Sequence, residues 1–157
     1  MERVDVAELD TFPHPAGATD GGRALADALG TTDVAMNHYT LAPGDACSGG
    51  VHTHLDQEEI FYVLSGRVPF QTKDDDRTVT EGEVIRFAPG EYHHGTNRTD
   101  EEAVVLAIGA PGKRHDWEQI RVPVPCPECG VDAMGVDFGA GEAGGLRCPE
   151  CGETMGV

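Results

Sequence analysis

The feature that most constrains the fold of this chain is a series of short β-rich runs between residues 34 and 110. The runs are VAMNHYTL, EIFYVLSG, RVPFQT, TVTEGEVIRFAPG and EEAVVLAIG, and clusters of Gly, Pro and Asp separate them. Several short strands with turn signals between them are typical of a β-sandwich or a closed barrel. Proline lacks the ladder N–H donor, so Pro69 within RVPFQT predicts an edge strand or a bulge. We therefore expect an all-β domain over residues 34–112.

The segments on either side of this region are patterned differently. Residues 1–33 are punctuated by Pro and Gly and predict an N-terminal arm, with one or two turns of helix over Arg23–Leu29. Residues 113–125 resemble an extended connector, and residues 126–157 hold four of the five cysteines. A chain of 157 residues has room for one domain of ordinary size and a small appendage.

Three histidines and a glutamate stand at suggestive positions on the predicted strands. His52 and His54 are two residues apart, so on a strand their imidazoles project from the same face. Glu59 follows at the start of the next run, and the turn over 55–58 would fold its carboxylate back toward the two rings. His93 lies on a later strand, after the turn Ala-Pro-Gly.

These residues resemble the two signature motifs of the cupin family. The first motif, His-x-His, three or four residues, Glu, six residues and Gly, is matched from His52 to Gly66. The second, Gly, five residues, Pro-x-Gly, two residues, His, three residues and Asn, is matched from Gly82 to Asn97, with Ala88 where the motif has Pro. The glycine expected before the first motif is not at its usual distance. The 15 residues between the motifs are typical of a compact single-domain microbial cupin.

The resemblance covers about residues 34–110 and implies a double-stranded β-helix, the jelly-roll or cupin barrel, with a metal ion in its mouth. It implies four ligands: His52, His54, Glu59 and His93. The donor chemistry agrees, because three imidazoles and one carboxylate suit Fe(II), Mn(II), Ni(II), Cu(II) or Zn(II) and leave positions for water and substrate. Some cupin barrels hold no catalytic metal and use these histidines for packing or ligand contact, so that alternative stays open.

Other polar residues near the motifs offer alternatives. Glu58 is the rival carboxylate because the family tolerates a three-residue gap, whereas Glu59 keeps the six-residue distance to Gly66. His94 alternates to the opposite face of its strand, which predicts contact with solvent or with groups behind the ligands. His14 and His115 receive no ligand role. His38 lies on a predicted strand and is expected to be structural.

The cysteines near the C-terminus form two near copies of one motif, Cys126-Pro-Glu-Cys129-Gly and Cys148-Pro-Glu-Cys151-Gly. Each can form a tight turn in which the following glycine takes a positive φ and backbone N–H groups point at the sulfurs. Two such turns together predict a tetrahedral four-thiolate site for one structural Zn(II), in a small zinc-ribbon-like element. A disulfide pair and a redox Cys-x-x-Cys are the alternatives.

The sequence of this element limits what it can bind. Its glycine-rich middle holds too few apolar residues for a core without metal. Between residues 126 and 157, Arg147 is the only basic residue against six acidic ones, so no phosphate-binding surface is available. Structural stabilisation or contact with a partner protein is the better interpretation. The fifth cysteine, Cys47, is expected to be a small buried residue.

The charge balance is extreme, with 28 acidic residues, 11 basic ones and a formal net charge of −17. A hydrophobic content of 39% argues against disorder, so we expect a protein from the salt-rich cytoplasm of an extreme halophile, where screening suppresses self-repulsion. Such a surface disfavours nucleic acid and acidic membrane faces. The chain opens with Glu2, Arg3 and Asp5, and no apolar run approaches about 20 residues, which favours a cytoplasmic protein.

Together these features predict a mononuclear metal-dependent enzyme of the dioxygenase or isomerase type that acts on a small organic molecule. The alternative is a non-catalytic cupin module that binds a small ligand or metal and contacts a partner protein through its ribbon. No helix-turn-helix pattern accompanies the barrel, which argues against a DNA-binding regulator. A homodimer is compatible with either function.

Overall fold

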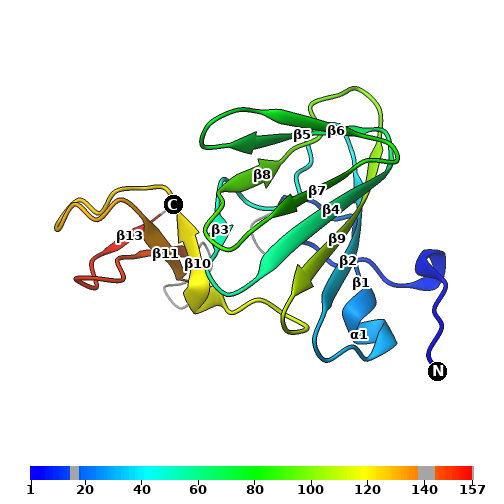
Figure 1. Ribbon diagram of the computed structural model, residues 1–157, viewed down its shortest axis with the longest axis horizontal. Helices are drawn as coiled ribbons and strands as arrows, with labels where there is room; N and C mark the ends of the chain where they lie inside the picture. The colour runs from blue at the N-terminus through cyan, green and yellow to red at the C-terminus, as the bar shows by residue number, and fades with distance from the viewer. Residues whose placement is uncertain (15–17, 138–143, 157) are drawn as a thin grey trace.

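The computed structural model describes residues 1–14, 18–137 and 144–156, and strands dominate it (Figure 1). Short helical segments occur at η1 (Val6–Glu8), α1 (Leu25–Leu29) and η2 (Trp117–Gln119). The predicted helix over 23–29 is therefore confirmed from Leu25, while the two residues before it belong to a strand. No helix of the described residues is long and apolar enough to cross a bilayer.

The larger sheet of the barrel has the strand order β1-β2-β9-β4-β7, and each neighbouring pair is antiparallel. Side chains along its long strands alternate between the core and the outside, as a half-buried antiparallel sheet requires. On β9, for example, Ala103, Val105 and Ala107 are buried and the residues between them are partly exposed. The strands are β1 (Gly22–Ala24), β2 (Ala35–Leu41), β4 (Glu58–Ser65), β7 (Val84–Phe87) and β9 (Ala103–Ala110).

The facing sheet has the order β6-β5-β8, with β5 (Arg67–Thr72) between β6 (Arg77–Thr80) and β8 (His93–Gly95). The prediction of an edge strand or a bulge at Pro69 is wrong, because β5 is the middle strand and its register with β6 is regular through Pro69 opposite Thr78. Pairing with β8 begins one residue later, at Phe70 opposite Gly95, and the Pro69 carbonyl accepts a bond from Thr96 N–H at 3.1 Å. The proline nitrogen thus lies at the end of the β8 ladder, where a missing donor interrupts little.

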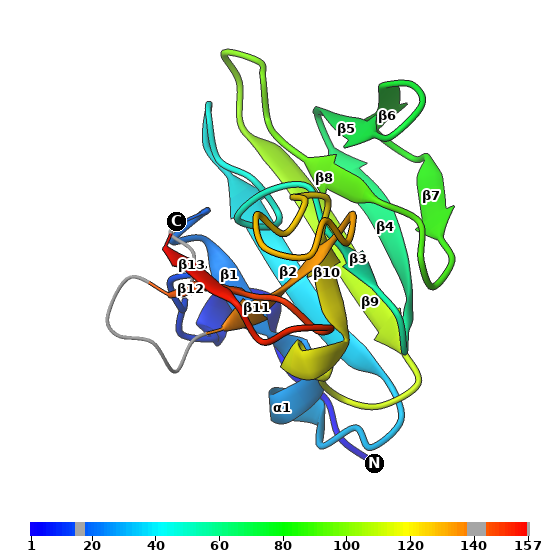
Figure 2. The ribbon, with the colours of Figure 1, turned by 90° about the vertical axis from the view of Figure 1, so that its left-hand side faces the viewer.

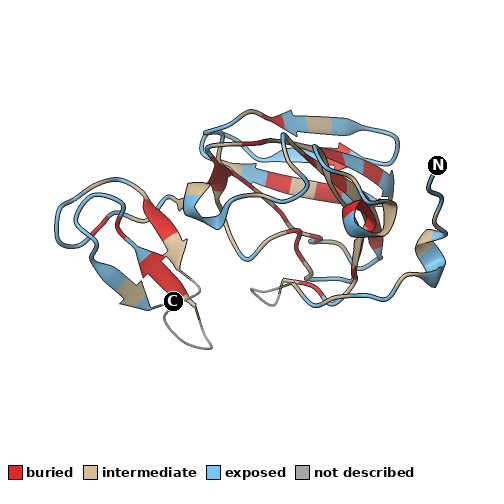
Figure 3. Ribbon diagram, turned by 90° about the horizontal axis from the view of Figure 1, so that it is seen from below, coloured by how far each residue is buried: buried red, intermediate tan, exposed pale blue. Residues whose placement is uncertain are grey.

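A cluster of aromatic rings fills the space between the two sheets. The ring centroids of Phe61 and Phe70 are 5.0 Å apart, and that of Phe87 lies 6.2 Å and 5.7 Å from them. All three side chains are buried, and Val63 and Val68 are inaccessible to solvent beside them. Figure 3 shows buried segments along the strands of the barrel. The expected all-β double-stranded β-helix is confirmed.

The cysteine-bearing ribbon is part of a third sheet that reaches into the barrel. Its order is β13-β12-β11-β10-β3. In this sheet β10 pairs with β3, with Ile120 opposite His54 and Arg121 opposite Thr53. A strand from the predicted connector therefore joins the ribbon to β3, which carries the candidate ligand His54. Figures 1 and 2 show this sheet at one end of the barrel. The strands are β3 (Thr53–His54), β10 (Ile120–Val122), β11 (Met134–Asp137), β12 (Gly145–Arg147) and β13 (Thr154–Gly156).

Candidate functional site

Three separate segments bring the predicted barrel ligands to one place. His52 and His93 form an isolated antiparallel bridge in which each backbone N–H donates to the other's carbonyl, at 2.9 Å and 3.2 Å. His54 lies two residues further along, on β3, and Glu59 lies at the start of β4. The backbone pairing thus fixes the relative position of the two sequence motifs.

The side-chain atoms of the four residues converge. Glu59 Oε2 lies 2.7 Å from His93 Nε2, 3.3 Å from His54 Nε2 and 3.9 Å from His52 Nε2, and the last two nitrogens are 3.2 Å apart. Ligand atoms that share one ion at about 2.1 Å lie about 3–4 Å apart, so the set fits a single transition-metal ion. The ligand atoms of His52, Glu59 and His93 all lie within 4.8 Å of one another, and His54 approaches the first two.

Hydrogen bonds at Nδ1 of two of these rings leave the lone pair of each Nε2 directed at the centre of the cluster. Nδ1 of His52 donates to the Gly50 carbonyl at 3.0 Å, and Nδ1 of His93 donates to the Glu91 carbonyl at 3.1 Å. With the proton on Nδ1, a neutral ring presents a bare Nε2. The bare Nε2 of His93 lies 2.7 Å from a Glu59 carboxylate oxygen, and two acceptors this close repel unless a proton or a metal cation lies between them. The donor set therefore fits a divalent metal ion.

The environment lowers the pKa values of His52 and Glu59. Burial lowers the pKa of His52 to about 3, so its ring is neutral at neutral pH. Burial alone would raise the pKa of Glu59, but the interactions of its carboxylate with the His54 and His93 rings outweigh it and hold the pKa below its ordinary value. Neutral imidazoles and an ionised carboxylate are the forms that bind a metal.

A turn supports the ligand strands at the point where the second motif departs from its pattern. The Glu91 N–H donates to the Ala88 carbonyl at 3.0 Å, and Pro89 and Gly90, which has φ +90°, occupy the two central positions. Proline followed by a positive-φ glycine suits a type II turn. Gly90 N–H also donates to the His54 carbonyl at 2.8 Å. The proline displaced by one residue is therefore compatible with the ligand geometry.

The rival polar residues lie elsewhere. Glu58 pairs with the exposed Arg86 guanidinium, away from the three imidazoles. His94 Nδ1 lies 3.0 Å from Ser48 Oγ, behind the ligand cluster, and its pKa is lowered by burial. His38 does not line the cavity over the cluster, and its buried Nδ1 has no hydrogen-bond partner among the described residues.

The ligand cluster forms part of the wall of a cavity of about 440 Å³, whose other residues sequence reasoning missed. His115 lies over His54 at a ring distance of 5.1 Å and is itself in edge contact with Trp117, at 4.2 Å. Buried Gln57 holds the loop before His115 by donating to the carbonyls of Gly112 and Arg114, at 3.3 Å and 3.2 Å. These long-range contacts help to bring His115 to the site, and no local spacing indicated them.

Another hollow, of about 460 Å³, lies beside the N-terminal arm between Thr19, Arg23 and Asp45. It is more open than the barrel cavity and contains none of the predicted ligands. Its Thr19 and Asp45 side chains bond each other at 2.7 Å, which satisfies the polar atoms there. We therefore assign the chemistry to the barrel cavity.

The four ribbon cysteines form the second candidate metal centre. Sγ of Cys126 lies 3.6 Å from that of Cys151, and Sγ of Cys129 lies 3.5 Å from that of Cys148. Disulfide sulfurs are about 2.05 Å apart, whereas four thiolates at about 2.3 Å from one zinc ion lie about 3.8 Å apart. The glycines that follow the two motifs have φ of 76° and 79°, as the tight turns require. The geometry fits a four-thiolate metal site, and in this structure the sulfurs of these pairs are too far apart for a disulfide.

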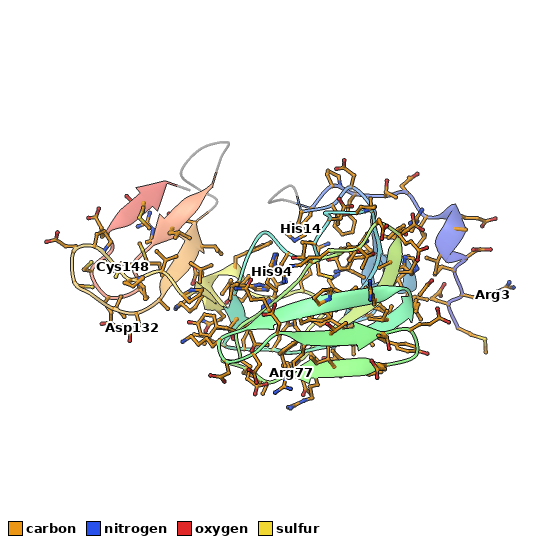
Figure 4. The ribbon with its side chains drawn as sticks, turned by 90° about the horizontal axis from the view of Figure 1, so that it is seen from above. Arg3, His14, Arg77, His94, Asp132 and Cys148 are labelled. Carbon is orange, nitrogen blue, oxygen red and sulfur yellow. The ribbon has the colours of Figure 1, made fainter. Side chains whose placement is uncertain are left out.

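Backbone groups support thiolate at one of these cysteines. Burial opposes ionisation of Cys148, but the N–H groups of Glu150 and Cys151 lower the pKa of its thiol to about 6. Cys151 N–H lies 3.4 Å from this sulfur. Cys47 differs, since burial raises the pKa of its thiol to about 12 and it lies in the barrel core, as the sequence predicted. In Figure 4, Cys148 lies within the ribbon, and His94 lies in the barrel.

Comparison with known proteins supports the class that the fold and the cluster define. Residues 37–109 match the Cupin domain family. No curated protein matches the chain in sequence. The barrel therefore has the support of both its sequence and its structural neighbours for the cupin superfamily.

Solved structures resemble the chain over different lengths. A sugar phosphate isomerase from a cupin superfamily, from Silicibacter pomeroyi, is 20% identical with a TM-score of 0.62, over 98% of this chain and 92% of that chain. The polyketide cyclase RemF from Streptomyces resistomycificus is 21% identical with a TM-score of 0.61, over 73% and 81%. A putative sugar phosphate isomerase from Acidithiobacillus ferrooxidans is 25% identical with a TM-score of 0.57, over 66% and 67%. The first two show the fold alone.

Proposed function

We propose that this protein is a mononuclear metal-dependent enzyme that acts on a small organic molecule. His52, His54, Glu59 and His93 hold the ion, and the cavity beside them holds the substrate. The convergence of three imidazole nitrogens and one carboxylate oxygen, with two rings oriented by backbone carbonyls, carries the proposal. A pocket of about 440 Å³ is within the range of small-ligand sites.

The residues around the cluster have distinct roles in this proposal. A divalent transition metal supplies Lewis-acid polarisation of a substrate oxygen or a place for dioxygen. The carbonyls of Gly50 and Glu91 keep the rings of His52 and His93 in the metal-binding tautomer. Burial keeps the thiol of Cys47 neutral, so this cavity residue is a wall and not a nucleophile.

The reaction type is an isomerisation or a dioxygenation. The resemblance to the putative sugar phosphate isomerase from Acidithiobacillus ferrooxidans supports the first. Isomerisation needs no co-substrate, whereas dioxygenation consumes oxygen, so an oxygen electrode separates the two. We further propose that the four cysteines hold one structural zinc ion, which stabilises the ribbon.

Metal analysis of the full chain, with a substrate screen, tests the proposal. The wild-type protein should hold about two ions per chain, and the variant His52→Ala plus His54→Ala should hold about one, the ribbon zinc. Turnover of a small organic molecule by the wild type, and its loss in the double variant, would support an enzyme. Unchanged stoichiometry in the variant would refute the barrel site. Ligand binding without turnover across the screen would instead favour a non-catalytic binding module.

A further inference from the structure

One wall of the barrel cavity belongs to the ribbon. Val122 on β10, Val136 on β11 and Leu146 on β12 line the cavity together with the ligand cluster. The register places Leu146 opposite Val136 on neighbouring strands, so their side chains share a face of the ribbon sheet. The ribbon thus presents a small apolar surface toward the metal site.

The backbone connects this surface rigidly to the metal site. β10 is bonded to β11 on one side and to β3, the strand of His54, on the other. Ile120, opposite His54, is buried and also lines the cavity. The sheet that carries a ligand therefore also places the ribbon beside the cavity.

The charges around the cavity restrict what can occupy it. Among the described lining residues there is no lysine or arginine, and the only carboxylate is that of Glu59. Apolar side chains dominate the rest of the lining, including Phe61, Ile108 and Trp117. Proteins bind phosphate mainly through arginine, lysine or clustered backbone N–H groups. Apart from the proposed ion and the backbone of residues 48–50, the lining offers a buried dianion few such partners, which makes its burial costly. The net charge of −17 adds long-range repulsion of anions.

We propose that the ribbon is the specificity wall of the barrel site. The substrate is a small organic molecule that places oxygen atoms on the ion and an apolar part against Val122, Val136 and Leu146, and it carries no phosphate group. This inference rests on the proposed function, and it names the substrate class of the same site. It also gives the ribbon a role that its sequence alone did not indicate.

Two metal-chelating probes of different apolar size test the wall. Acetohydroxamate and benzohydroxamate bind a metal through the same two oxygens, and they differ in a methyl against a phenyl group. Calorimetric titration of the full chain, loaded with Mn(II) in the barrel and zinc in the ribbon, should give tighter binding of benzohydroxamate by about tenfold or more, because the phenyl group buries more apolar area. Acetohydroxamate binding reports the ion alone.

Isosteric valine variants give a matched control. Val136→Thr and Val122→Thr place a hydroxyl on the wall at constant size, whereas Val131→Thr makes the same change at a ribbon position that packs on the ribbon core and does not line the cavity. The wall variants should lose at least about threefold of the preference for benzohydroxamate, and Val131→Thr should retain it. Zinc content and circular dichroism establish that each variant is folded. Because two wall positions are tested, the comparison stands even if one wall variant does not fold.

The outcomes separate this inference from the proposed function. If neither hydroxamate binds the metal-loaded wild type, the metal site fails and this inference falls with it. If both hydroxamates bind but with equal affinity, the ribbon is not the specificity wall, while the metal site stands. The same conclusion follows if Val131→Thr reduces the preference as much as the wall variants do. Fructose and fructose 6-phosphate test the charge: the phosphate should give no gain in affinity, and a tenfold gain would overturn the substrate class.

Discussion

At the scale of single residues, Glu59 carries the electrostatics of the barrel site. Its carboxylate faces three imidazoles, and it supplies the only negative charge among the described cavity residues. The adjacent Glu58 has the same side chain but pairs with Arg86 at the surface. The two residues therefore offer a comparison in which size and sequence neighbourhood are matched.

Glu59→Gln should weaken binding of the barrel ion by at least about tenfold, because it removes a ligand charge and keeps the shape. Glu58→Gln should leave that affinity unchanged, since an exposed ion pair contributes at most about 1 kcal/mol to stability and nothing to the ion. Competition with a chromophoric chelator measures both affinities. An equal loss in the two variants would show that the carboxylate is wrongly assigned.

His52 should make the stability of the protein without its barrel ion depend on pH. The pKa of its ring is about 3 in the folded protein against an ordinary 6.5, so between these values the unfolded chain binds a proton that the folded chain does not. The free energy of unfolding should therefore fall as the pH falls from 6.5, by at most about 1.4 kcal/mol per pH unit from this group. The lowered pKa of Glu59 adds a loss only below 4.5.

Urea unfolding at several pH values between 7.5 and 4.5 measures this dependence. His52→Gln should reduce the slope of the curve between pH 6.5 and 4.5, because glutamine does not titrate. Part of the slope should stay, because burial also lowers the pKa values of His14, His38, His94 and His115. An unchanged slope in this variant would show that His52 is not the group that takes up the proton.

The sequence predicted part of this site for a simple reason. Strand alternation places His52 and His54 on one face, and the cupin spacing supplied Glu59 and His93, which the structure brings together with them. His115 could not be predicted, since its place depends on the bonds from Gln57 to loop carbonyls more than 50 residues along the chain.

At the scale of secondary-structure elements, the pairing of β10 with β3 is the decisive feature. The positive φ values of Gly130 and Gly152 could be predicted, because a tight turn after Cys-x-x-Cys needs them. The pairing of β10 with β3 could not be predicted, because β3 has two residues and β10 has three, which are too few for a periodic pattern. The predicted boundary between connector and ribbon stays a prediction, and β10 lies within that connector.

Cys148→Ser should remove the ribbon zinc and also weaken the barrel ion several-fold. Without the zinc the ribbon core, built around Met134 and Leu146, is too small to hold β10 against the strand of His54. Metal analysis and limited proteolysis measure the effects, with new cleavage expected beyond residue 122. Cys47→Ala is the control and should keep the zinc. Retained zinc in Cys148→Ser would refute the four-cysteine site, and full barrel affinity without zinc would refute the coupling.

At the scale of the whole molecule, the excess of 17 negative charges must be accommodated on a small surface. Three successive aspartates, residues 74–76, follow β5, and two of them face arginines at 3.3 Å and 3.1 Å. These pairs are exposed, and each contributes little to stability in water. Most of the acidic excess therefore depends on the solvent for its screening.

Salt should accordingly govern stability. The Debye length rises from about 3 Å in 1 M salt to above about 10 Å at 0.05 M, so repulsion among carboxylates becomes effective over many neighbours at low salt. We expect the melting temperature to fall by at least about 5 °C between 2 M and ~0.05 M KCl, since 1 kcal/mol corresponds to about 2–4 °C in a domain of this size. Circular dichroism with both metal sites loaded measures the shift, because loss of an ion would otherwise mimic it.

Sucrose at low salt is the control, because it favours the folded state by exclusion from the surface and does not screen charge. A melting temperature that is constant across this range would contradict the inferred adaptation to a salt-rich cytoplasm. Full recovery in sucrose alone would show that exclusion, and not charge screening, stabilises the fold.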